Sequence, residues 1–120
     1  MIIVKKMKLS KTDIARARKE LEDYIWVLVD VRRGLIAAGD DDMYTLRDAL
    51  LTRRSLPSDI YALGLDMKTG EITFSRHINR HNPVVKAAGG ITEEDKARVC
   101  ERIYYFFEHL PVIERMQARF

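Results

Sequence analysis

The sequence predicts a single α+β domain over residues 1–120, in which an antiparallel sheet packs against three main helices. Two strand-turn-strand patterns indicate this fold, because each places a short turn that contains glycine between two candidate strands. Helical periodicity in three further stretches is the other observation. The expected order of elements is therefore β-α-β-β-α-β-β-α, with both hairpins in one sheet.

The chain is expected to begin with a short strand and a helix. Residues 2–5 are mostly β-branched, which favours a strand. Ser10 then precedes Asp13, as an N-cap precedes an acid in the first helical turn. Apolar side chains follow at the spacing of one helical face, at Ile14, Ala17, Leu21 and Tyr24. This spacing predicts a first helix over residues 11–23.

A hairpin and a second helix are expected next. Residues 25–31 are dense in β-branched and aromatic side chains, and Gly34 marks a turn into residues 35–38. Three aspartates at 40–42 then precede apolar positions with helical spacing. Because the residue before a proline disfavours helical geometry, Pro57 is expected to end the second helix.

A second hairpin and a third helix are expected to complete the sheet and the helices that pack on it. Residues 60–67 and 71–78 flank a short glycine turn, which predicts two further strands. Residues 82–91 read as the one sizeable loop, too short for a linker between domains. Thr92 precedes three acids, which predicts a capped helix that ends near residue 109.

Composition and charge restrict the class of protein. With 47% apolar and 32% charged residues, the chain has ordinary globular composition, and no apolar run approaches the roughly 20 residues that span a bilayer. Cys100 is the only cysteine, so no intrachain disulfide is possible, and we expect a cytoplasmic protein. The net charge of +3 comes mainly from the N-terminal lysines Lys5, Lys6, Lys8 and Lys11. These lysines permit nucleic-acid binding without indicating it.

Two histidines form the strongest candidate site. On an extended strand, His77, Asn79 and His81 would project onto one face, with Arg76 and Arg80 at alternating positions between and before them. Such a surface could act in acid–base chemistry or bind phosphate. A shared zinc ion is disfavoured, because residues four apart on a strand are separated by roughly 13 Å and zinc binds nitrogens at about 2 Å. The alternative is a solvated sheet face.

Three weaker candidates each have a structural alternative. The aspartates at 40–42 could bind magnesium or cap a helix. Gly89 and Gly90 could cradle a phosphate, but the acids at 93–95 would repel it, which favours an ordinary loop. Cys100 lies on the apolar face of the third helix, where a buried thiol is a poor nucleophile. No cofactor or metal is expected.

The last third of the chain carries more apolar surface than one sheet can cover. The four consecutive rings of Tyr104, Tyr105, Phe106 and Phe107 point about 100° apart on a helix. After Pro111, apolar side chains recur at near-helical spacing, which predicts an amphipathic tail over residues 111–120. These apolar positions of the tail are Val112, Ile113, Met116 and Phe120. Either the tail folds back over the rings, or rings and tail form a homodimer interface.

The chain resembles a family of small prokaryotic proteins of unknown function. The resemblance rests on the strand-turn-strand segment at residues 27–39, on residues 48–51 and 59–65, and on Phe74, Ile78 and Asn79. It extends over roughly residues 1–105. It implies the α+β architecture, and the family has no established activity to transfer.

These observations favour one class of function and leave two alternatives. Because no pattern supplies a nucleophile with its base and an orienting group, we expect a non-catalytic interaction or regulatory module that acts as a homo-oligomer. One alternative is a small hydrolase or ribonuclease, with His77 or His81 as acid–base and Arg76 or Arg80 stabilising phosphate charge. The other is a weak nucleic-acid binder that uses the N-terminal lysines.

Overall fold

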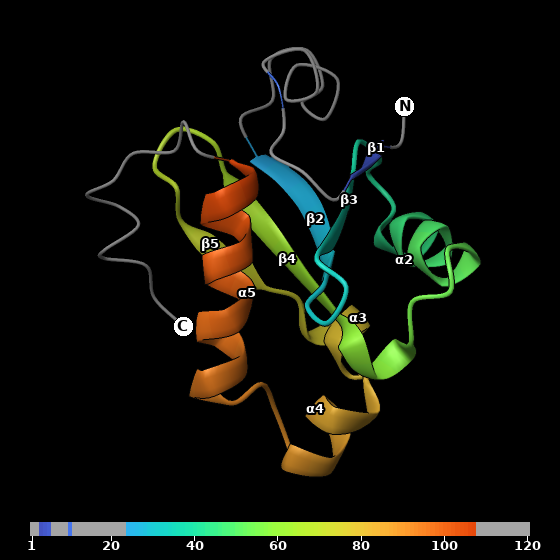
Figure 1. Ribbon diagram of the computed structural model, residues 1–120. Helices are drawn as coiled ribbons and strands as arrows, with labels where there is room; N and C mark the ends of the chain where they lie inside the picture. The colour runs from blue at the N-terminus through green and yellow to red at the C-terminus, as the bar shows by residue number, and fades with distance from the viewer. Residues whose placement is uncertain (1–2, 6–9, 11–23, 108–120) are drawn as a thin grey trace.

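The computed structural model describes residues 3–5, 10 and 24–107, which form an α+β fold built on a five-stranded antiparallel sheet (Figure 1). The order across the sheet is β1-β3-β2-β4-β5. The strands are β1 (Ile3–Lys5), β2 (Tyr24–Asp30), β3 (Leu35–Ala38), β4 (Ile60–Asp66) and β5 (Ile72–Phe74). The helices are α2 (Met43–Thr52), the short 3-10 turn η1 (Pro57–Asp59), α3 (Arg76–Asn79), α4 (Pro83–Ala88) and α5 (Glu93–Phe106).

The predicted fold class is confirmed, and both hairpins form. Strands β2 and β3 pair antiparallel, β4 pairs with β5, and β4 joins the two hairpins by pairing along all of β2. The short N-terminal strand is also present, because Ile3 pairs with Ala38 of β3. The helix expected over residues 11–23 lies outside the described residues.

Helices cover both faces of the sheet. Helix α5 packs on one face and α2 on the other, on opposite sides of the sheet in Figure 1. Successive residues of the central strand β2 alternate between these two layers: Val27 and Val29 belong to the α5 core, and Leu28 to the α2 core. The middle of the sheet is therefore buried on both faces.

Two helices end earlier than the sequence predicts. Helix α2 ends at Thr52 because Arg54 adopts a left-handed backbone, with φ of 69°, before the proline is reached. Helix α5 ends at Phe106. The backbone of Phe107 is no longer helical, with φ of −112° and ψ of 64°.

The prediction of a strand over residues 71–78 is wrong in its second half. Strand β5 ends at Phe74, and α3 begins two residues later. Ser75 lies at the change and caps the new helix, since its hydroxyl oxygen accepts a hydrogen bond from the Ile78 backbone N–H. His77, Asn79 and His81 therefore do not share the face of one strand.

The segment read as a loop over residues 82–91 contains α4. Asn82 caps this helix by accepting hydrogen bonds from the backbone N–H groups of Val84 and Val85, and Pro83 occupies its first turn. Gly89 ends it in the left-handed conformation that glycine adopts without steric cost, with φ of 73°.

Asp30 holds the turn between β2 and β3. Its Oδ1 accepts hydrogen bonds from the backbone N–H groups of Arg32 and Arg33, at 3.0 and 2.9 Å. The Ser55 hydroxyl donates to the other carboxyl oxygen, Oδ2, at 2.6 Å. Because Asp30 and Ser55 are both buried, these bonds fasten the hairpin turn to the segment that leaves α2.

Candidate functional site

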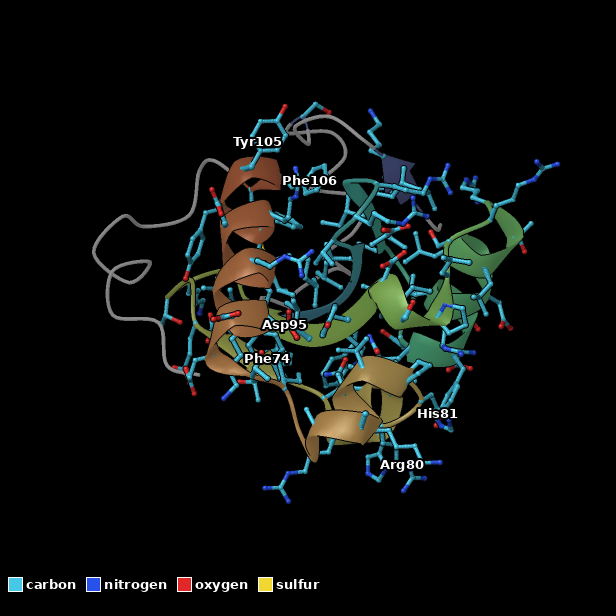
Figure 2. All side chains as sticks on the ribbon, turned by 60° about the horizontal axis from the view of Figure 1, so that its bottom comes forward. Phe74, Arg80, His81, Asp95, Tyr105 and Phe106 are labelled. Atoms are coloured by element: carbon cyan, nitrogen blue, oxygen red, sulfur yellow. The ribbon has the colours of Figure 1, made fainter. Side chains whose placement is uncertain are left out.

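A cleft of about 770 Å³ lies beside β5, at the edge of the sheet. Residues 71–75 form one wall, and α3, α4 and the first turn of α5 contribute the others. Val85, Ile91 and Phe74 give the cleft an apolar part, and they pack against the core beneath α5. Figure 2 shows Phe74 beside the first turn of α5.

The charged side chains that line this cleft are predominantly cationic. Arg76 and Arg80 come from α3 and its C-cap, Lys86 from α4 and Lys96 from α5. Glu71 is the one acid among the described residues that line it. The cleft therefore has an excess of positive charge on walls that are partly apolar, an arrangement that concentrates anions.

Three of these four cations are free to meet a ligand. Lys96 lies 3.5 Å from a carboxylate oxygen of Glu93. Within residues 24–107, Arg76, Arg80 and Lys86 form no ion pair. Arg80 projects away from the body of the molecule in Figure 2.

Two buried asparagines hold the helical walls against β4. The Asn79 side chain accepts a hydrogen bond from the Ala62 backbone N–H at 2.7 Å and donates to the Ala62 carbonyl oxygen at 2.9 Å. Asn82 donates to the carbonyl oxygens of Ile60 and Ser58, at 2.9 and 3.2 Å. Side-chain amides thus pair with the edge of β4 where β5 has ended, and this pairing fixes α3 and α4 at the cleft.

A tyrosine beneath α5 adds to this framework. The Tyr61 side chain is buried and interacts with Asp95 of α5 and with Asn82. Burial, together with the neighbouring negative charge of Asp95, raises the pKa of Tyr61 to about 12, so the phenol stays protonated at neutral pH.

A second cleft, of about 570 Å³, lies on the opposite face of β5; its surface is largely apolar and includes several aromatic rings, and we call it the aromatic cleft. Tyr24 and Trp26 of β2 line it, with their rings in edge-to-face contact. The Tyr24 ring lies against Gly64, where a Cβ would come 2.1 Å from the tyrosine hydroxyl oxygen. A side chain at position 64 would therefore displace this ring. Residues 73–76 line both clefts, so the two hollows meet around β5.

The structure separates the histidines of the sequence-predicted site. His77 is exposed and lines the aromatic cleft. His81 lies beside Tyr44 of α2, with its Nε2 atom 3.4 Å from the tyrosine hydroxyl oxygen. Asn79 is 2% exposed and bonded to the sheet. Of the five predicted side chains, only Arg76 and Arg80 line the cationic cleft together.

Of the weaker candidates, Gly89 and Gly90 line the cationic cleft, whereas Asp40 and Asp42 have structural roles. Asp42 caps α2 by accepting from the Tyr44 backbone N–H, and Asp40 accepts from the Asp42 backbone N–H. In the part of the chain that the structure describes, no three His, Cys, Asp or Glu side chains gather to hold a metal ion. Of the N-terminal lysines, Lys5 lies in β1 and the others are outside that part.

Phe106 and Phe107 are core residues, so the prediction that they face a second subunit is wrong for these two rings. They are 0% and 1% exposed within the single chain. Because the backbone leaves the helix at Phe107, its ring packs into the core. Tyr104 is partly buried against the same core, and Tyr105 is 47% exposed. Val112, Ile113, Met116 and Phe120 lie outside the described residues.

Cys100 is buried on the core side of α5, as its place on the apolar face predicts. Burial raises the pKa of its thiol from an ordinary value of 9.0 to about 12, which the nearby Lys96 opposes. The thiol is therefore protonated at neutral pH and is a poor nucleophile.

This pKa predicts a loss of stability at high pH. Above pH 9 an unfolded chain releases the thiol proton and the folded chain retains it, so the free energy of unfolding falls until the pH passes the folded pKa. We expect a loss of about 1 kcal/mol between pH 9 and pH 10. Urea unfolding of the unmodified chain and of Cys100→Ala, at pH 9 and at pH 10, measures this loss in the free energy of unfolding. The loss should be smaller in Cys100→Ala, and equal losses would contradict the prediction.

The cleft contains residues that sequence reasoning missed. Lys86 lies in the segment read as a loop, and Lys96 follows the acids of the first turn of α5. The signal for α4 was present, because Asn82, Pro83 and Gly89 are an N-cap, a first-turn proline and a helix-ending glycine. No local pattern showed that these lysines approach Arg76.

Fold and cleft together define a small α+β protein with a cationic cleft beside β5 of its sheet. A family model described as "Protein of unknown function (DUF5674)" matches residues 2–104, and the chain belongs to this family. No curated protein and no solved structure matches the chain. Among the described residues, no helix is long and apolar enough to cross a membrane.

Proposed function

We propose that this protein is a non-catalytic binding module whose cationic cleft binds an anionic ligand. The observation that carries the proposal is the convergence of Arg76, Arg80, Lys86 and Lys96 on one cleft from three different helical segments. Several cations gathered on one cleft attract anions more strongly than scattered surface lysines do, because their fields add at the same place.

The positions of the histidines favour binding over catalysis. His77 lines the aromatic cleft and His81 lies beside Tyr44, so the two imidazoles have different surroundings. A hydrolase or ribonuclease needs an acid and a base beside the group that it cleaves. Neither histidine lines the cationic cleft.

Homo-oligomerisation and a regulatory role stay predictions. Tyr105 is the exposed ring of the aromatic run on α5, and it lines a smaller hollow with Arg98 and Arg102. Light scattering at two protein concentrations would measure the subunit number.

Titration calorimetry with tripolyphosphate tests the proposed cleft. The double variant Arg80→Gln and Lys86→Gln removes two charges from the cleft walls, and neither side chain is buried. At about 1 kcal/mol per removed charge, we expect roughly thirtyfold weaker binding. Raising the salt concentration should also weaken binding to the unmodified chain, because the cleft is open to solvent.

Arg47→Gln is the matched control, because Arg47 lies on α2, which covers the other face of the sheet. This variant should bind tripolyphosphate as the unmodified chain does. An equal loss in the control and in the double variant would indicate diffuse attraction to the whole protein and would refute the cleft as the site.

A further inference from the structure

The edge strand β5 turns backbone groups away from the sheet. The Asp66 N–H donates to the Glu71 carbonyl oxygen at 3.0 Å, and the Ser75 N–H donates to the Ala62 carbonyl oxygen at 3.1 Å. In an antiparallel ladder, hydrogen-bonded and non-hydrogen-bonded pairs alternate. The residues between these points, Ile72 and Phe74, therefore direct their N–H and C=O groups away from β4.

These outward groups have no partner within residues 24–107, because β5 is the last strand of the sheet and its hydrogen bonds go to β4. The side chains do not cover the edge: Ile72 is buried in the core beneath α5 and Phe74 packs against that core. Residues 71–75 all line the cationic cleft. Among the described residues, the edge of β5 is thus an unpaired strand edge that borders the cleft and can pair with a further strand.

The charge of the cleft restricts what can lie on this edge. Arg76 of α3, its C-cap Arg80 and Lys86 of α4 all line the cleft. The residues after α5 contain as many arginines as glutamates, at Glu108, Glu114, Arg115 and Arg119. They are therefore not an acidic segment that matches the cleft, and the charge favours a separate partner.

We propose that the edge of β5 binds an extended acidic peptide segment of a partner protein as a sixth strand, with alternate carboxylates directed toward Arg76, Arg80 and Lys86. This inference rests on the proposed anion binding and names its ligand. Strand addition satisfies the outward groups of Ile72 and Phe74, and the alternation of side chains along a strand places every second residue on the cationic side. The other residues point to the aromatic cleft, which suits apolar side chains.

A peptide fits these observations better than a nucleic acid. Both carry negative charge, but a nucleic-acid strand has no ladder of amide donors and carbonyl acceptors to match a strand edge. The aromatic rings of the second cleft are candidates for base stacking, so a single-stranded oligonucleotide belongs among the probes.

The experiment uses a fluorescent ten-residue peptide that alternates glutamate and valine, titrated into the full chain by fluorescence anisotropy. Two derivatives are N-methylated, one at every glutamate and the other at every valine. In a strand ladder only one of these sets donates to β5. We expect one derivative to bind at least tenfold more weakly and the other to bind as the parent does. A lysine–valine peptide should not bind.

Amide hydrogen exchange places the peptide on the edge. In the free protein the N–H groups of Ile72 and Phe74 should exchange quickly, and that of Thr73, which faces Gly64 of β4, should exchange slowly. The glutamate–valine peptide should slow the exchange of the Ile72 and Phe74 N–H groups at least tenfold and leave the exchange rate of the Thr73 N–H unchanged. Unchanged exchange at both residues would overturn the inference.

The remaining outcomes separate this inference from the proposed function. Equal affinity of both methylated peptides, weakened in both cases by Arg80→Gln with Lys86→Gln, would overturn strand addition and keep anion binding. Binding of tripolyphosphate or of oligothymidine without binding of the peptide would do the same. If none of these anions binds, both proposals are wrong.

Discussion

Replacing Asn79 with alanine is expected to lower the free energy of unfolding by about 2–5 kcal/mol, a large part of the stability of a small domain. The substitution removes both hydrogen bonds between the side-chain amide and the backbone of Ala62. Ser75 still donates to the Ala62 carbonyl oxygen, but the Ala62 N–H is left buried without an acceptor. The volume of the lost side chain adds a cavity.

Urea unfolding followed by circular dichroism measures this loss. His77→Ala is the matched control, because His77 is the exposed neighbour in the same short helix, and its replacement should change stability by about 0.5 kcal/mol or less. If the two variants were equally stable, the sheet edge would not depend on the Asn79 amide.

The second large effect is expected at Asp30. Asp30→Ala removes the acceptor for the N–H groups of Arg32 and Arg33 and for the Ser55 hydroxyl. Because Asp30 and Ser55 are buried, water replaces these bonds poorly, and we expect a loss of about 3 kcal/mol or more.

Asp30→Asn distinguishes the stability lost with the hydrogen bonds from the stability lost with the side chain itself. The asparagine oxygen can still accept from both backbone N–H groups, and its amide can donate to the Ser55 oxygen. We therefore expect this variant to lose less than half of what Asp30→Ala loses, as measured by thermal unfolding. Equal losses in the two variants would show that the turn does not depend on these acceptors.

Local signals were sufficient to predict the two hairpins. Residues 25–38 and 60–74 each place a glycine turn between two strands, and the register of each hairpin follows from its own turn. The helical face of α5 was equally readable, since Val99, Cys100 and Ile103 lie in the core.

The candidate site could not be predicted in the same way, because tertiary contacts decide it. The alternating sequence of residues 71–78 is compatible with a strand of full length and with a strand that ends before Ser75. The shorter strand is favoured by the pairing of Asn79 with Ala62, which is 17 residues away along the chain. The cationic cleft likewise combines Arg76 with Lys96 from a different helix, and no sequence spacing records that the two residues line one cleft.

The phenylalanines show the same limit at the end of α5. Helical geometry predicts that Phe107 points about 100° away from Phe106, and so cannot share its environment. The chain leaves the helix at that residue, and both rings enter one core.

Burial of β2 between two helical layers has a consequence for how the strand finds its alignment. In a sheet with one solvent-exposed face, a shift by one residue would move polar side chains into the core. The free-energy cost of burying them selects the correct register. Residues 27–29 are apolar on both sides, so a slipped strand would meet little such penalty. Asp30 selects the native register of β2. Only this register brings its carboxyl group to the Ser55 hydroxyl, and a shift by one residue would bury the carboxyl group without a hydrogen-bond partner.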